Sequence, residues 1–170
     1  MIEHRQNEII ICDGLQSALS TAERVCTVVF ANQTAPIPPY PYVSYTITQA
    51  VTKNNKGYCI DNEGNRYKEI SQVWSLTVHS DDDVDAMNIA VKAYDWLGII
   101  SNTYLEDNNI IVQGISGINN RDNLISIEYE HCYGFDVTFN ILNKIDSTKF
   151  DNDGTIERVN IEEQNIDISK

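Results

Sequence analysis

The chain has 170 residues, the length of one typical domain, and its 42% hydrophobic and 22% charged content is that of an ordinary globular protein. Twelve Lys and Arg against 25 Asp and Glu give a formal net charge of −13. This charge argues against a nucleic acid or an anionic membrane as a tightly bound partner, because both need a cationic surface.

Two further features narrow the class of protein. The four cysteines form no CxxC pair, so their spacing predicts neither a zinc centre nor a redox motif. The charged start MIEHRQNE lacks the apolar run of a secretion signal, and no apolar stretch approaches the roughly 20 residues of a membrane span. We therefore expect the protein to stay in the cytoplasm where it is made.

The first elements are a helix and a short strand. Apolar residues at helical spacing predict a helix over 2–19, although Gly14 weakens the pattern slightly. The β-branched run 25–32 then predicts a strand.

All four prolines follow directly, in the stretch 35-APIPPYPYVSYTIT-48. A PxxP ligand motif and a structural hinge both fit this composition. A ligand motif belongs in a mobile, polar, low-complexity segment, whereas this stretch runs without a gap into a strand. Because proline fixes φ and favours extended geometry in the preceding residue, we interpret the segment as a stiff strap that sets how the next strand enters the sheet. The Tyr40–Pro41 bond is a candidate for the cis isomer.

The rest of the chain alternates strands with a second helix. Period-two alternation predicts strands over 42–51, 58–60, 66–80, 109–118 and 124–145, and Gly134 marks a bulge or bend in the last one. Residues 81–98 predict a helix with Ser80 as its cap, acids in the first turn and Gly98 at its end. Its broad apolar face is predicted from Val84, Met87, Val91, Tyr94 and Leu97, flanked by Ala86, Ala90 and Ala93.

This order predicts an α+β fold with helices packed on an antiparallel or mixed sheet. Residues 1–145 form the expected domain. Residues 146–170 are acidic, with isolated apolar residues that cannot build a core, and predict an extended C-terminal tail or arm.

Motifs for chemistry are weak. The run Asp81–Asp85 is typical of a solvated helix start, and the three histidines are far apart in sequence. Glu128 and Glu130 share one face of a strand, where exposed acids are common. We predict no catalytic residue, no metal site and no cofactor. An enzyme or ligand-binding domain is the alternative, and it needs a cleft where some of Glu128, Glu130, His79, His131 and the acidic run converge.

Three segments in order resemble a known family: 36-PIPPYPYVSYTIT-48, 74-WSLTVHSDDDVDAMNIAVKAYDWLG-98 and 129-YEHCYGFDVTFNI-141. Over about residues 5 to 145 the chain is similar to neck or tail terminator proteins of tailed bacteriophages and related contractile particles. On these segments we expect structural or subunit-interface roles for Pro36, Pro38, Pro39, Tyr40, Pro41, Tyr42, Tyr129, Tyr133, Gly134 and Phe135.

The resemblance implies a ring, usually a hexamer, that caps the tail tube in the virion neck, ends tube polymerisation and joins the head-side connector. Its partners would be other copies of the chain, tail tube and sheath subunits, and connector proteins, assembled in the cytoplasm of the bacterial host. DNA would only pass through as the genome, along an acidic wall that it does not bind tightly. Another neck ring, such as a head–tail adaptor, is the nearest alternative.

Overall fold

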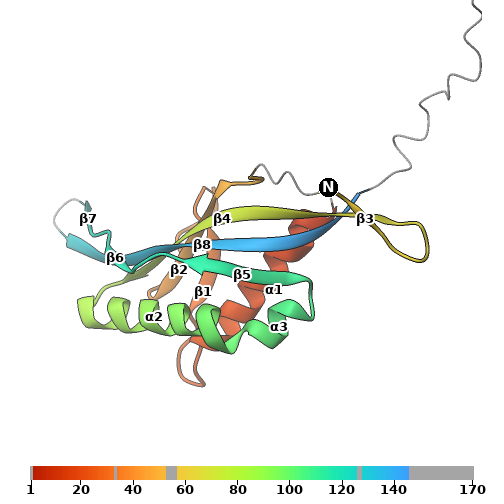
Figure 1. Cartoon of the computed structure of the whole chain (residues 1–170). Helices are drawn as coiled ribbons and strands as arrows, with labels where there is room; N and C mark the ends of the chain where they lie inside the picture. Colours follow the sequence, from red (N-terminus) through yellow and green to blue (C-terminus); the bar gives the residue numbers. More distant parts are fainter. Residues whose placement is uncertain (1, 33, 53–56, 126–127, 146–170) are drawn as a thin grey trace, which may run out of the picture.

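A computed structural model describes residues 2–32, 34–52, 57–125 and 128–145, and it has a mixed sheet with helices against one face (Figure 1). In chain order the elements are α1 (Ile2–Leu19), β1 (Thr27–Phe30), β2 (Tyr42–Gln49), β3 (Cys59–Ile60), β4 (Arg66–Ser80), α2 (Asp83–Asp95), the π-helix η1 (Trp96–Ile100), α3 (Asn102–Glu106), β5 (Ile110–Ile115), β6 (Asn119–Asn120), β7 (Asn123–Ile125) and β8 (Glu128–Ile145). The predicted α+β class is confirmed. The expected tail, 146–170, lies outside the described residues.

The sheet is built around the long strands β4 and β8. Its strand order is β1-β2-β4-β8-β5, with β1 parallel to β2 and the other neighbours antiparallel. The β4–β8 register runs without a shift from Arg66 opposite Ile145 to Ser80 opposite His131. Because side chains alternate along a strand, this register fixes which residues of both strands face the helices.

The core lies between this sheet and the helices. Trp74 of β4 is fully buried, stacks on Tyr45 with ring centroids 4.9 Å apart, and meets Phe139 edge-on at 5.4 Å. α1 adds the buried Ile11 and Leu15. Within the described part of the chain, no helix is long and apolar enough to cross a membrane.

The start and end of the second helix differ from the prediction. Asp82 caps α2, since its Oδ1 accepts the N–H of Asp85 at 2.8 Å, while Ser80 Oγ accepts the N–H of Asp82 at 3.3 Å. Gly98 does not end the helical segment, which continues through η1 into α3. The reason is packing: Trp96 and Tyr104 from these two turns lie against Gly14 of α1, where a Cβ atom would come within 2.8 Å and 2.6 Å of the two rings.

The region after β5 also differs. The predicted turn 119–123 contains β6, which pairs with Tyr133 and Gly134, and the start of β7, which forms a hairpin with the first residues of β8. The predicted strand 124–145 is therefore two strands.

Gly134 marks no bulge, because Thr77 lies opposite it in an unbroken register. Glycine is needed there for close approach instead. A Cβ atom would lie 2.5 Å from the carbonyl oxygen of Leu76 and 2.8 Å from Cδ of Arg121, whose side chain crosses this point. The Arg121 guanidinium donates to Ser75 Oγ at 2.8 Å. It also donates to Thr77 Oγ1 at 3.0 Å and Asp136 Oδ1 at 3.1 Å.

This close approach generates a stability prediction. We expect Gly134→Ala to lower the free energy of unfolding by about 1–3 kcal/mol, because the backbone of Leu76 cannot move out of the way without disturbing the β4–β8 pairing. Denaturant unfolding of the purified protein measures the change. Gly117→Ala is the matched control, since a Cβ atom there has no neighbour within 4 Å. Equal stability of the two variants would contradict this account.

Candidate functional site

The proline strap, defined here as residues 34–41, joins the parallel strands β1 and β2. Pro36 and Pro39 are exposed, Pro38 is half-buried, and Pro41 is buried after a cis Tyr40–Pro41 bond. A hollow of about 230 Å³ separates the strap from the sheet, with Tyr42, Ser44 and His79 at its floor. This volume is below the roughly 300 Å³ at which small-molecule pockets begin, so the hollow is a poor ligand site.

Polar side chains gather at the end of the strap, on the face of the sheet opposite the helices. The hydroxyls of Tyr40 and Tyr42 each donate to Oε1 of Glu130 at 3.1 Å. The ring of Tyr42 stacks between Tyr40, at 5.8 Å, and His79, at 4.4 Å. The strap is thus tied to β4 and β8 by both ring stacking and hydrogen bonds.

His79 is the centre of this group. Its Nδ1 lies 3.0 Å from Glu130 Oε1 and 3.3 Å from Cys132 Sγ, and its Nε2 lies 2.9 Å from Ser44 Oγ. The sheet register brings these residues together, because Tyr42 is opposite His79 and His79 is opposite Cys132. We call this set the Glu130 cluster; its members are Tyr40, Tyr42, Ser44, His79, Glu130 and Cys132.

Burial sets the protonation of the Glu130 cluster. It lowers the pKa of His79 below its ordinary 6.5, and the attraction of Glu130 offsets this only in part. Burial also raises the pKa of the Cys132 thiol to about 12 and raises the pKa of Tyr42. At neutral pH the cluster therefore holds a neutral imidazole, a thiol and two phenols. Glu130, only 8% exposed, accepts hydrogen bonds from the two phenols.

Ser44, His79 and Glu130 are in hydrogen-bond order, as in a serine hydrolase. The convergence of His79 and Glu130 meets one requirement of the enzyme alternative. However, Ser44 lies within β2, opposite Val29 of β1 and Thr77 of β4. The backbone N–H groups near Ser44 therefore belong to the hydrogen bonding between these strands. An oxyanion hole instead needs N–H donors that point at the reacting atom. The arrangement is suited to holding the strap, not to acyl transfer.

The acidic run has structural partners. Asp85 accepts two hydrogen bonds from Arg24, both 2.9 Å, and these lower the pKa of its carboxyl group. Asp83 Oδ1 accepts the Tyr133 hydroxyl at 3.0 Å, and His131 Nδ1 lies 3.7 Å away. The start of α2 is thus bound both to the segment before β1 and to β8.

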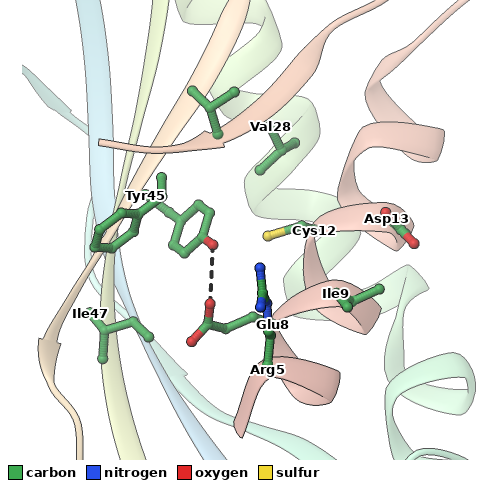
Figure 2. A pocket seen from close by; sticks show the side chains of 10 residues that line it. Arg5, Glu8, Ile9, Cys12, Asp13, Val28, Tyr45 and Ile47 are labelled. Atoms are coloured by element: carbon green, nitrogen blue, oxygen red, sulfur yellow. Dashed lines mark hydrogen bonds between the residues drawn. The ribbon is translucent and has the colours of Figure 1, made fainter. Parts of the chain in front are cut away.

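A second hollow, of about 500 Å³, lies between α1 and the strands β1 and β2 (Figure 2). Tyr45 reaches across it and donates to Glu8 Oε2 at 3.4 Å. Ile9 and Phe30 on its lining are 46% and 38% exposed. Burial raises the pKa of Cys12 to about 12, so this thiol is not a nucleophile at neutral pH. We call this hollow the α1 groove.

The largest correction concerns the face of α2. Val84, Met87 and Val91, predicted to pack on the core, are 57%, 41% and 43% exposed. The buried face consists of Ile89 and the three predicted flanking alanines, Ala86, Ala90 and Ala93. The predictions for Leu97, which is fully buried, and Tyr94, which packs partly buried against the core, are confirmed. Small alanines let the helix axis approach the sheet, and the larger side chains form an exposed apolar row that we call the α2 stripe. Ile99 and Ile100 in η1 are also exposed, at 73% and 69%.

The predicted site residues separate into three groups. The six of the proline segment lie together on the strap and the start of β2. Tyr133 is half-buried against Asp83, Gly134 lies beneath Arg121, and Phe135 is fully buried, edge-on to Tyr94 at 5.7 Å. Tyr129 pairs with Leu124 through the backbone, and its side chain is outside the described part. Sequence reasoning missed Ser44 and Cys132; it named His79 and Glu130 only for the enzyme alternative, and it placed Glu130 on an exposed face, whereas Glu130 is buried.

Comparison with known families gives one clear result. A sequence model of the family described as phage neck terminator protein matches residues 11–168. This range extends past residue 145, so it includes most of the segment expected as a tail. Among curated proteins, none matches the chain.

The lowered pKa of His79 generates a pH prediction. Below pH 6.5 the unfolded chain protonates His79 more readily than the folded protein does, so the unfolded state binds more protons. The free energy of unfolding should fall as the pH decreases from 6.5 toward the lowered folded pKa. Urea titrations between about pH 7.5 and pH 5 measure this slope. The variant His79→Gln, which keeps His4 and His131, should show a shallower slope; an unchanged slope would contradict the assignment.

Proposed function

Because the chain belongs to the phage neck terminator family, whose members are structural proteins of the virion, we propose that it forms a ring, a hexamer, on the end of the tail tube. The ring ends tube polymerisation and joins the tube to the head-side connector. Its partners are other copies of the chain, tail tube and sheath subunits, and connector proteins. Assembly takes place in the cytoplasm of the bacterial host. In this proposal the protein acts by contact and not by catalysis.

The observation that supports a ring best is the α2 stripe. Val84, Met87 and Val91 lie on successive turns of a helix whose other face already packs on the sheet. When these three side chains stay in water, the protein loses a stabilising free energy of about 25 cal/mol for each Å² of apolar surface that could be buried. A neighbouring copy of the chain that covers the stripe recovers this free energy of burial.

The α1 groove is the counterpart that we assign to the stripe. A closed ring needs two different surfaces on each subunit, because contacts of one surface with its own copy produce a dimer. The groove offers exposed Ile9 and Phe30 to an apolar row, and the exposed Arg5 at its lining can pair with the acids before α2. The apolar residues of both surfaces and their opposite charges therefore support a head-to-tail contact between copies.

The net charge supports a ring through which DNA passes without being tightly bound. At −13 per subunit, a ring is strongly acidic, and acids along its lumen repel a passing polyanion. In the same proposal, residues 1–145 form the ring domain and residues 146–170 form an arm.

An electron-microscopy map of the particle, or of purified tail tubes with added protein, tests the function. We expect the chain as a single ring on the head-proximal end of the tube, and tubes that stop growing when it is present. A position between the connector and the terminating ring would assign the chain to a head–tail adaptor instead. A monomer in free solution would not decide the matter, because docking on the tube can drive assembly.

The stripe generates a mutational prediction. Val84→Glu should weaken ring formation on the tube at least about 10-fold, because it places a charge in an apolar contact. Binding to purified tubes by co-sedimentation measures the loss. Ile60→Glu is the matched control, since Val84 and Ile60 are both 57% exposed and Ile60 lies on β3, away from the stripe. Thermal unfolding of both variants should stay within about 0.5 kcal/mol of the parent. Equal losses in the two variants would exclude the stripe as the interface.

A further inference from the structure

We propose that His79, Glu130 and Cys132 bind a zinc ion between the strands β4 and β8. Their three donor atoms, an imidazole nitrogen, a carboxylate oxygen and a thiol sulfur, all lie within 4.8 Å of one another. Nitrogen, oxygen and sulfur from these residue types are the ordinary ligands of zinc in proteins.

The sheet itself builds the geometry. Glu130 and Cys132 are two residues apart on β8, so their side chains leave the same face, and His79 is directly opposite Cys132 on β4. Zinc bonds of about 2.0–2.3 Å at tetrahedral angles require ligand separations of about 3.4–3.6 Å. The observed separations from His79 Nδ1 are 3.0 Å to Glu130 and 3.3 Å to Cys132. Movements of a few tenths of an ångström would open the site to an ion.

The number of protons on His79 is compatible with such an ion. Nδ1 of His79 faces two groups, Glu130 and Cys132, but the ring nitrogen carries at most one proton to share between them. Nε2 faces Ser44 Oγ at 2.9 Å. When Nδ1 is a ligand, Nε2 carries the proton and donates it to Ser44, as metal-binding histidines donate to an outer partner.

Charge gives the strongest argument. Glu130 is buried, and the groups that contact it on the described residues are the hydroxyls of Tyr40 and Tyr42, the imidazole of His79 and the thiol of Cys132, without a Lys or Arg among them. A buried carboxylate without a cationic partner is costly. Zinc binding would release one proton, from the Cys132 thiol, while His79 stays neutral and changes tautomer. One thiolate and one carboxylate then balance the two positive charges of the ion.

A second group of donors on the described residues makes a useful contrast. Asp83, Asp122 and His131 also lie close together. Asp83 is 51% exposed, and the N–H of Cys132 and a tyrosine hydroxyl already bind the two acids. Water solvates these carboxylates, so no buried charge requires an ion there.

Cobalt(II) is the probe that tests the site. Metal-free protein should bind one equivalent of Co²⁺ with a near-ultraviolet sulfur-to-cobalt charge-transfer band, and added Zn²⁺ should remove that band by displacement. Cys132→Ser should lose the band and bind Zn²⁺ more than about 100-fold more weakly. Ser44→Ala, which removes only the outer partner of His79, should weaken binding by roughly 10-fold.

Cys59→Ser is the matched control, because it removes an exposed thiol far from the cluster, and it should leave both the band and the affinity unchanged. If Cys132→Ser does not fold, Glu130→Gln replaces it; this variant should keep the sulfur band but lose most of the affinity. The absence of a thiolate band in the parent protein, or a band that depends on Cys59, would overturn the proposal. The cluster would then be a hydrogen-bond network only.

Discussion

The unbroken pairing of β4 with β8 is the constraint on which the rest of the structure depends. It places Trp74 beside the buried Phe135, Val137 and Phe139 on one face, and it places His79 beside Cys132 on the other. A slip of one residue would move every one of these side chains to the opposite face. The apolar core therefore fixes the register, and that register alone places His79 and Cys132 of the polar cluster side by side.

The two faces are held by different interactions. The helix face is buried in the usual way, by apolar contact. The opposite face is secured by long polar side chains that cross it: Arg121 passes over Gly134 to Asp136, and Tyr40 and Tyr42 reach Glu130. Such ties keep their charged ends hydrogen-bonded and so avoid the cost of an unpaired buried group. They also explain the glycine in the YGFD segment, which the guanidinium of Arg121 needs for space.

Local patterns predicted much of the fold and little of the site. The first helix and the strand 66–80 agree closely with α1 and β4, because apolar residues recur at helical spacing in the one and alternate from Ile70 onward in the other. α2 is apolar around most of its surface, so hydrophobicity alone could not predict whether Val84 or Ala86 packs on the sheet. The buried face depends on how closely the sheet approaches the helix. Gly134 was predicted to mark a bulge or bend, but the alternating residues on both sides of it have odd numbers, so they lie on one face of a continuous strand. Ser44, His79 and Cys132 are brought together by register alone, for which a single sequence carries no signal.

The start of α2 connects the strap to the exposed stripe. Ser80, the last residue of β4, follows His79 directly and donates to Asp85 at 3.0 Å, while Tyr133 of β8 holds Asp83. Both acids flank Val84, the first residue of the α2 stripe. The strands that carry the Glu130 cluster thus also set the position of this end of the helix, through short hydrogen bonds and not through a flexible loop. In the proposed ring the contacts of each subunit repeat identically, and these hydrogen bonds between the sheet and α2 hold the first residue of the stripe in a defined position.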